Sequence, residues 1–373
     1  MIDRRLLKNF DWGILFAVLA ISLIGVMTIY SATRPVLDAE QQTYYLKQLY
    51  WICLGLICFF VVVSIDYRWF IKSAYVFFLI GIVLLILVLV AGRKGSGAQR
   101  WIPLGFMSFQ PSEFFKIFFV MALSRYLSGI WRNEILGMME LTKIVLIFVL
   151  LPAILILKQP HLGTVMILLF ILLSMTLTVG IRKKIVVVGL IIVLISLPFV
   201  GTILWGELKT YQKQRIIAFV NPYVDQQGEG YHIKQSKVSI GSGGFWGKGY
   251  LRGTQGPLRF LPEKHTDFIF SVFAEEWGFA GSILLFLLYL FVMLRGIDTA
   301  MKARDPAGSF LALGVTAMLA FYFFINVGMT LALLPVVGVP MPFMSYGGTA
   351  LLSNFMAIGV LVNVRMRRYP LFY

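Results

Sequence analysis

The sequence has 373 residues, of which 59% are hydrophobic and only 13% are charged, and its formal net charge is +16 at pH 7. Soluble domains carry roughly 25% charged residues, so this composition excludes an ordinary soluble enzyme and predicts a polytopic helical membrane protein. The positive charge does not indicate a nucleic-acid partner, because the basic residues are spread along the chain and no soluble basic domain carries them. It favours membrane headgroups and anionic lipid substrates.

Basic residues and apolar runs together predict the topology. Arg4, Arg5 and Lys8 place the N-terminus in the cytoplasm, and the first apolar run, which starts near Trp12 without a clear cleavage site, is expected to be a retained span. The predicted spans are residues 12–32, 46–65, 69–91, 112–130, 142–158, 161–181, 185–206, 267–294, 310–333 and 345–364. Every connection that this count assigns to the cytoplasm is basic, so both termini are predicted to be cytoplasmic.

Two predicted outer connections are longer than the others, Gly92–Pro111 and Glu207–Thr266. A connection as long as the second generally has a function or a structure of its own. The expected fold is therefore all-α and polytopic, with about ten transmembrane helices. We expect a single membrane domain over residues 1–373, with a large extracytoplasmic loop at 207–266 between the seventh and eighth helices. Cys53 and Cys58 share one apolar run and point to different sides of a helix, so no disulfide is expected.

The stretch Leu261–Phe268 ends the large loop, and Asp267 is its last polar residue before an apolar run. This position predicts a carboxylate at the mouth of a membrane helix, where an ionisable group indicates function and the helix dipole favours negative charge. The structural alternative is that Thr266 or Asp267 caps the helix that follows. The two interpretations are compatible, because a capping residue can also be catalytic.

The glycine-rich run Gly241–Gly249 contains Lys248 and invites comparison with a phosphate-binding loop. It departs from that motif, because Ser242 stands five residues before Gly247 and a glycine follows the lysine. Tight turns that need positive φ angles are the favoured interpretation. The alternative is a nest in which backbone amides and Lys248 bind a diphosphate headgroup.

Charged pairs also lie inside predicted spans. Glu113 and Lys116, three residues apart, either neutralise each other or face Asp267 in an internal polar cavity. The adjacent Glu275 and Glu276 cannot share a helix face, so at least one needs a polar partner, and a structural role is favoured for them.

The three histidines, His161, His232 and His265, form no zinc pattern. A divalent cation, Mg²⁺ or Mn²⁺, held by carboxylate and diphosphate oxygens is compatible with the sequence, and no organic cofactor is indicated. The link Leu334–Pro342 and the motif Ser345–Gly348 predict irregular backbone between spans, which a membrane tolerates where it lines a cavity.

Several of these motifs, in this order, resemble the SEDS family (shape, elongation, division and sporulation) over nearly the whole chain, and within it the elongation branch, the RodA group. The resemblance rests on Gly97–Trp101, Phe109–Glu113 with Lys116, Gly230–His232, Gly241–Gly249, Gly253–Gln255, Leu261–Phe268, Glu275–Gly278, and Gly338–Pro340 through Ser345–Gly348. One position departs from the family pattern, because this chain has His161 where the family usually has an aspartate.

The resemblance implies a peptidoglycan glycosyltransferase of the bacterial cytoplasmic (inner) membrane, with ten spans and a catalytic aspartate that matches Asp267. It implies lipid II as the substrate, undecaprenyl diphosphate as the leaving group, and a class B penicillin-binding transpeptidase and elongation-complex membrane proteins as partners. On this hypothesis Asp267 is the general base for the sugar hydroxyl. The candidate substrate-binding residues are Arg100, Glu113, Lys116, Arg215, Lys237, Lys248, Glu263, Lys264, His265 and Ser345.

Two functions from other classes remain open at the level of sequence. A lipid II flippase would equally need polytopic helices and an internal polar cavity, although no inverted symmetry between the halves of the chain is visible. A non-catalytic scaffold for the transpeptidase would not need Asp267. The one-sided outer loop that ends in a carboxylate favours the enzyme.

Overall fold

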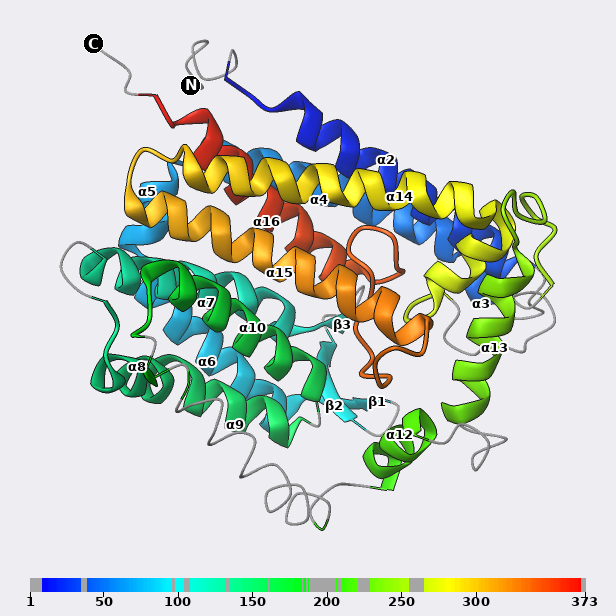
Figure 1. Cartoon of the computed structure of the whole chain (residues 1–373), viewed down its shortest axis with the longest axis horizontal. Coiled ribbons are helices and arrows are strands. Elements are labelled where there is room, and N and C mark those ends of the chain that lie inside the picture. Colours follow the sequence, from blue (N-terminus) through cyan, green and yellow to red (C-terminus); the bar gives the residue numbers. More distant parts are fainter. Residues whose placement is uncertain are drawn as a thin grey trace.

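The computed structural model describes residues 9–34, 39–95, 98–103, 108–131, 135–159, 161–182, 184–185, 187, 206, 210–220, 229–254 and 265–369. These residues form a bundle of long helices, most of which cross the view of Figure 1 from one end of the molecule to the other. Eight helical stretches of the described residues are long and apolar enough to cross a membrane. The prediction of an all-α polytopic membrane protein is confirmed.

Nine of the ten predicted spans correspond to helices. They are α2 (Trp12–Thr33), α4 (Tyr44–Ser64), α5 (Tyr67–Lys72) with α6 (Ala74–Ala91), α7 (Pro111–Ile130), the stretch α8 (Met138–Ile144), η1 (Val145–Leu150) and α9 (Leu151–Lys158), α10 (Leu162–Val179), α14 (Ile269–Met301), α15 (Pro306–Thr330) and α16 (Gly348–Met366). The seventh predicted span, 185–206, lies almost entirely outside the described residues. The count of ten therefore stays a prediction.

The helices depart from the predicted spans in three places. The third span is two helices, because the chain breaks at Ser73 between α5 and α6. The fifth span has a π-helical middle, η1, just before Pro152. The helix α7 is not among the eight apolar stretches, because it carries Glu113, Lys116 and Arg125.

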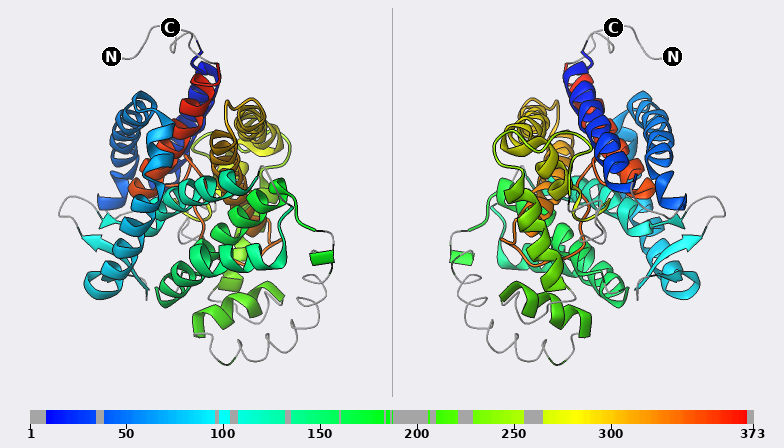
Figure 2. Two further views of the ribbon diagram at one scale, coloured as in Figure 1. Left: turned by 90° about the vertical axis from the view of Figure 1, so that its left-hand side faces the viewer. Right: turned by 90° about the vertical axis from the view of Figure 1, so that its right-hand side faces the viewer.

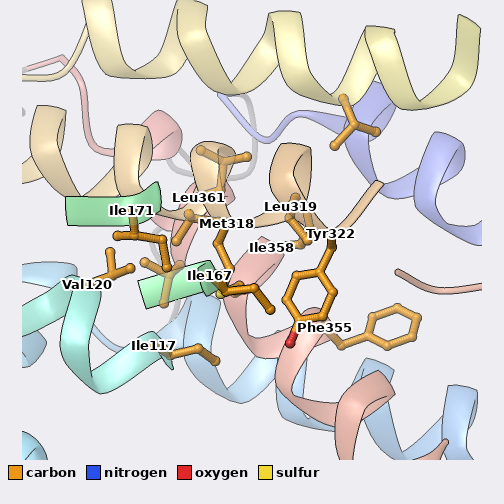
Figure 3. Packing of buried hydrophobic residues seen from close by; sticks show 14 of the residues in the cluster. Ile117, Val120, Ile167, Ile171, Met318, Leu319, Tyr322, Phe355, Ile358 and Leu361 are labelled. Carbon is orange, nitrogen blue, oxygen red and sulfur yellow. The ribbon is translucent and has the colours of Figure 1, made fainter. Parts of the chain in front are cut away.

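The core lies where α7, α10, α15 and α16 meet, and Figure 3 shows apolar side chains from all four helices packed together. These residues include Ile117, Val120, Ile167, Ile171, Met318, Leu319, Tyr322, Phe355, Ile358 and Leu361. Helices α15 and α16 are the most buried spans, whereas α6 and α14 turn much of their surface outward. A helix that is apolar all round and buried on one side only is expected where lipid covers the other side.

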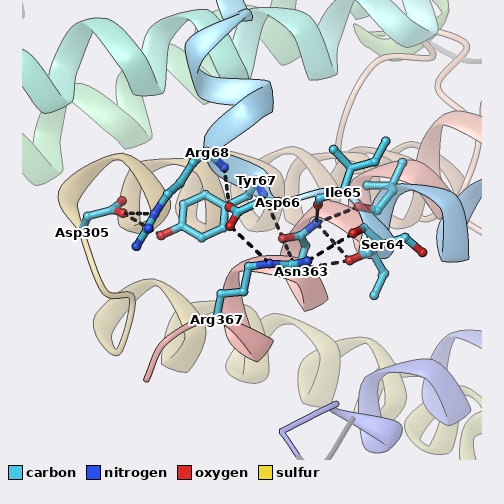
Figure 4. A network of polar contacts seen from close by, with 10 residues as sticks. Ser64, Ile65, Asp66, Tyr67, Arg68, Asp305, Asn363 and Arg367 are labelled. Atoms are coloured by element: carbon cyan, nitrogen blue, oxygen red, sulfur yellow. Dashed lines mark hydrogen bonds and ion pairs between the residues drawn. The ribbon is translucent and has the colours of Figure 1, made fainter. Parts of the chain in front are cut away.

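One end of the bundle, which we call the basic end, is joined by polar contacts between distant segments (Figure 4). The hydroxyl of Tyr67 donates to Asp305 Oδ2 at 2.7 Å, and Asn363 Nδ2 donates to the carbonyl of Val62 at 2.7 Å. Arg365 on α16 pairs with Asp11, the N-cap of α2, at 2.6 Å. These bonds fix the α4–α5 junction against the start of α15 and the last turns of α16.

The opposite end, which we call the loop end, carries the short elements. They are α3 (Ala39–Gln42), β1 (Arg93–Gly95), β2 (Ala98–Pro103), β3 (Ser108–Phe109), α12 (Thr210–Val220) and α13 (Glu229–Ser242). The strands pair in the antiparallel order β1-β2-β3, which the sequence did not predict. In both views of Figure 2 the green helices α12 and α13 lie on the opposite side of the bundle from α4. The large loop thus has helical structure of its own.

Candidate functional site

Asp267 lies in the turn 265–268 that leads into α14, and it is half-buried. The N-cap position of α14 is Phe268, whose apolar side chain makes no capping hydrogen bond. The interpretation of Thr266 or Asp267 as a residue that caps this helix stays a prediction. The prediction that the carboxylate stands at the mouth of a long apolar helix is confirmed.

Side chains from distant segments hold the main chain on either side of Asp267. Asn326, fully buried in α15, donates from Nδ2 to the carbonyl of Asp267 at 3.0 Å and to the carbonyl of Val339 at 2.8 Å. Ser345 Oγ donates to the carbonyl of Thr266 at 2.7 Å and accepts from the amide of Met341 at 2.8 Å. The turn is thus held by α15 on one side and by the link 334–347 on the other.

An aromatic cluster continues this support on the other side of the turn. The amide of Tyr346 donates to the carbonyl of His265 at 2.9 Å, and the ring of Tyr346 stacks on Tyr44 with centroids 4.3 Å apart. The ring of His265 lies 5.0 Å from Tyr44. Gln48 donates to the carbonyl of Ser345 at 3.1 Å. His265 and Ser345, both predicted as site residues, therefore lie beside Asp267.

Gly338 marks the place where Asp267 and Arg215 come together. A Cβ atom at Gly338 would lie 3.3 Å from Asp267 Oδ2 and 3.8 Å from Arg215 Nη1. Its φ angle of +69° also favours glycine. Arg215 comes from α12, so the helix of the large loop carries a cation to the catalytic candidate.

Glu113 and Lys116 form a buried ion pair one turn into α7, with Nζ and Oε1 2.6 Å apart and both side chains at most 4% exposed. The hydroxyl of Tyr322 on α15 donates to Glu113 Oε2 at 2.9 Å, and Lys116 Nζ lies 4.4 Å from the centroid of the same ring. The predicted i, i+3 pair is confirmed, and Tyr322 completes it.

His161 lies at the turn between α9 and α10. Its Nδ1 lies 2.8 Å from Thr164 Oγ1, and its side chain is buried. Burial first, and then the positive charges of Arg100, Lys116 and Arg215, hold the pKa of His161 well below its usual range. The charges that act on this buried ring thus come from three separate elements, β2, α7 and α12.

Arg100 is oriented by the same turn. Its Nε donates to the carbonyl of Gln159 at 3.2 Å, and Gln159 in turn donates to the carbonyl of Leu85 on α6 at 3.1 Å. The short sheet thereby carries Arg100 from the first long connection to the turn before α10. This placement brings Arg100 of the connection Gly92–Pro111 next to the turn that contains His161.

Comparison with known proteins identifies the family. The model of the family described as "Cell cycle protein", named for FtsW, RodA and SpoVE, matches residues 11–369. The chain belongs to this family. It is 36% identical over 361 residues to the peptidoglycan glycosyltransferase MrdB of Escherichia coli, which covers 96% of this chain and 94% of that protein. It is 32% identical over 432 residues to the peptidoglycan glycosyltransferase RodA of Treponema pallidum, which covers 98% and 99%.

Solved structures agree with this assignment to the FtsW, RodA and SpoVE family. The fold is similar, with a TM-score of 0.82 and 30% identity, to a chain in "Structural coordination of polymerization and crosslinking by a peptidoglycan synthase complex", covering 96% of this chain and 98% of that one. It is also similar to the rod shape determining protein RodA of Thermus thermophilus, with a TM-score of 0.70, 28% identity, and coverage of 97% and 98%. The resemblance to SEDS proteins, closest to RodA, is confirmed.

Lys248 has a partner two turns into α14 of this FtsW/RodA/SpoVE-type chain. Its Nζ lies 2.7 Å from Oε1 of the fully buried Glu275, which also accepts from the amide of Thr254 at 2.7 Å. Ser31 on α2 donates to Glu276. The predicted need of these acids for polar partners is confirmed, and the role of Lys248 towards diphosphate stays a prediction.

The glycine run forms tight turns, as the favoured interpretation predicted. Gly244, Gly247 and Gly249 all have positive φ angles. The amides of Lys248 and Gly249 donate to main-chain carbonyls of α14 at 3.0 Å each. These two amides are therefore engaged within the fold, and the alternative of a backbone nest for diphosphate stays a prediction.

Of the remaining predicted site residues, the structure describes only Lys237. Lys237 is exposed on α13, and Glu263 and Lys264 lie outside the described residues. The residues that sequence reasoning did not single out are Tyr322, Asn326 and Gln159. Each is a polar side chain in an apolar stretch, which is the signal that could have identified them.

The described part of the chain contains no cluster of three His, Cys, Asp or Glu residues that could hold a metal ion. A divalent cation would therefore need oxygens of the substrate besides Asp267, because hard cations take six or more oxygen ligands. The described residues do not form a metal site by themselves.

Proposed function

We propose that this chain is a peptidoglycan glycosyltransferase that polymerises lipid II into glycan strands for cell-wall elongation and rod shape. The observation that carries the proposal is the half-buried Asp267, whose backbone is held by Asn326 and whose carboxylate lies with Arg215 near Gly338, in a chain whose relatives MrdB and RodA are named peptidoglycan glycosyltransferases. No observation favours the flippase or the scaffold.

In the proposed reaction Asp267 takes the proton from the 4-hydroxyl of the incoming lipid II sugar. The hydroxyl oxygen forms a bond to the anomeric carbon of the growing strand. The bond from that carbon to the diphosphate breaks, and its electron pair leaves on undecaprenyl diphosphate. Such proton transfer is typically worth about 10²–10⁴ in rate. Inversion requires the base and the leaving group to lie on opposite faces of the sugar.

The negative charge of the leaving diphosphate needs cations, and Arg100, Lys116 and Arg215 supply them in this proposal. The positive charges of all three contribute to the lowered pKa of His161, which supports a shared role. Because Glu113 is paired with Lys116, Arg100 and Arg215 supply the excess positive charge of the group. Guanidinium groups bind phosphate oxygens through paired hydrogen bonds, so the two arginines are the stronger candidates. No step of this mechanism requires a metal ion, although Mg²⁺ or Mn²⁺ bound to the diphosphate is compatible with it.

The proposed setting is the bacterial cytoplasmic (inner) membrane, with both termini in the cytoplasm and the loop end on the outer side. The basic connections at the other end support this orientation. The proposed partner is a class B penicillin-binding transpeptidase, with other elongation-complex membrane proteins. The relative whose structure describes polymerization and crosslinking in one synthase complex supports a crosslinking partner.

The test is polymerisation of lipid II by the purified protein in detergent, with glycan products resolved on a gel. Detergent solutions have no membrane sides, so transport alone cannot yield product. Asp267→Asn should lower the rate by about 10²–10⁴. The matched control is Asp305→Asn at the basic end, where asparagine also caps a helix well, and it should polymerise normally. Wild-type rates for Asp267→Asn would refute the base, and no product from the wild-type protein would refute the polymerase.

A further inference from the structure

Three exposed aromatic residues form a continuous patch at the loop end. Phe245 is 56% exposed, Trp246 is 80% exposed and Phe279 is 56% exposed. The rings of Phe245 and Trp246 have centroids 4.9 Å apart, and those of Phe245 and Phe279 lie 5.8 Å apart. Large aromatic side chains rarely stay this exposed in a group unless another phase or molecule covers them.

The patch surrounds a break in α14. Gly278 has φ +65° and ψ −162°, which interrupts the helix. The amides of Phe279 and Ala280, freed by the break, donate to the carbonyls of Gly244 and Phe245 at 2.9 and 3.0 Å. The turn 243–249 thus supplies the bonds that the helix lacks, which a membrane requires because lipid cannot satisfy backbone groups.

The break is also where α14 passes from the interior to the surface. Every residue of Ile269–Glu276 is buried, whereas the helix beyond Gly278 exposes apolar side chains. Those exposed residues include Phe279, Ile283, Leu284, Leu287, Leu290, Leu294 and Ile297. Phe279 therefore belongs both to the aromatic patch and to the lipid-facing row.

Helix geometry gives the depth of the patch. From Gly278 to Asp298, which pairs with Lys302 and Arg365, the helix rises about 30 Å. This rise equals the thickness of a hydrocarbon core of ~30 Å. When the charged residues lie at one membrane surface, Gly278 and the aromatic patch lie at the other.

We propose that Phe245, Trp246 and Phe279 form an aromatic anchor that binds the headgroup region of the outer leaflet. The proposal rests on the orientation given under the proposed function. Amphipathic aromatic rings are enriched at this level of membranes, and the patch continues the lipid-facing row of α14. The anchor holds the turn 243–249, and with it the buried first turns of α14, at a constant depth. It therefore sets the height of Asp267 relative to lipid-linked diphosphates in the same leaflet.

The test measures depth directly. The native thiols are removed by Cys53→Ser and Cys58→Ser, Trp246→Cys is labelled with a fluorescent nitrobenzoxadiazole group, and the protein is reconstituted into phosphatidylethanolamine–phosphatidylglycerol vesicles. Nitroxide quenchers sit on the headgroup, near the top of the acyl chain, or near its end. The matched ruler is Leu287→Cys with the same label, because Leu287 is 54% exposed in the middle of the lipid-facing row.

The label at Trp246 should be quenched about twofold more strongly by the headgroup and upper-chain nitroxides than by the chain-end nitroxide, with the opposite order at Leu287. Quenching at Trp246 by aqueous iodide but by no lipid nitroxide would overturn the proposal. Shielding that arises only on addition of the purified crosslinking partner would overturn it too, and would make the patch a protein-docking surface. The measurement does not depend on polymerisation, so the anchor and the proposed activity can fail separately.

Discussion

Asn326 is bonded to the backbone of Asp267, with its Nδ2 3.0 Å from the carbonyl oxygen of that residue, and the same amide donates to Val339 at 2.8 Å. One side chain of α15 therefore ties the catalytic candidate to the link that contains Gly338. Loss of this side chain removes a hydrogen bond from each of two carbonyls and releases the turn, although the carboxylate of Asp267 is not changed. Asn326 is in this sense a positioning residue.

We expect Asn326→Leu to lower the polymerisation rate about 10- to 100-fold, because a displacement of about 1 Å at a reacting group costs that order of rate. The control is Asn363→Leu at the basic end, because the side-chain amide of Asn363 also donates to a main-chain carbonyl, that of Val62. Both variants should lose stability, at about 1–3 kcal/mol for each carbonyl left unpaired. Only Asn326→Leu should lose rate per folded molecule, and an equal loss of rate in both would show that the effect is stability alone.

The buried pair of Glu113 and Lys116 allows a test that separates structure from chemistry. Either Glu113→Gln or Lys116→Met leaves one buried group without its counter-charge, and breaking such pairs costs about 3–5 kcal/mol. The double variant should recover much of this loss in thermal unfolding. If Lys116 binds diphosphate, the double variant should remain inactive despite its recovered stability. Recovery of both stability and activity would assign the pair a structural role only.

Features that depend on residues close together in the chain were predicted correctly from the sequence. Glu113 and Lys116 are three residues apart on one helix, and Asp267 directly precedes an apolar run, so their placement follows from helix geometry. The sequence alone could not predict that Asn326, Gly338 and Arg215 lie near Asp267, because those contacts join segments that are 50 residues or more apart in the chain. The helices of the large loop were also missed, since polar amphipathic segments such as α12 and α13 lack an apolar run. The short sheet depends on backbone pairing between strands, which the sequence pattern of this glycine-rich connection does not predict.

His161 makes the stability of the protein depend on pH. Its folded pKa is lowered, chiefly by burial and then by Arg100, Lys116 and Arg215. Below the ordinary histidine pKa of about 6.5 the unfolded chain binds a proton that the folded protein does not, so stability falls as the pH drops. Above that pH the contribution is fully present. We expect His161→Gln to flatten the decline in unfolding temperature between about pH 7 and pH 5. An unchanged slope in this variant would mean that other groups cause the decline.

Gly241 near the end of α13, the glycines of the turn 243–249 and Gly278 at the break in α14 give a graded series of alanine substitutions. At Gly241 the φ angle is not positive and a Cβ would meet open space, so Gly241→Ala should be neutral or should stabilise by about 0.4–1 kcal/mol. Gly244 also faces open space but has φ +55°, so Gly244→Ala should cost about 1–2 kcal/mol for the left-handed backbone alone.

Gly247 and Gly278 combine both penalties and should be the most sensitive members of the series. Their φ angles are +81° and +65°, and a Cβ at either position would overlap backbone atoms of the other segment, the carbonyl of Glu276 or the amide of Gly247. Gly247→Ala and Gly278→Ala should therefore lower the unfolding temperature more than Gly244→Ala, because the turn must move away from the broken helix and leave its amides unpaired. Thermal unfolding in detergent, with all four variants in parallel, measures the order. If Gly247→Ala were no worse than Gly241→Ala, the turn would not be bonded to α14 as described.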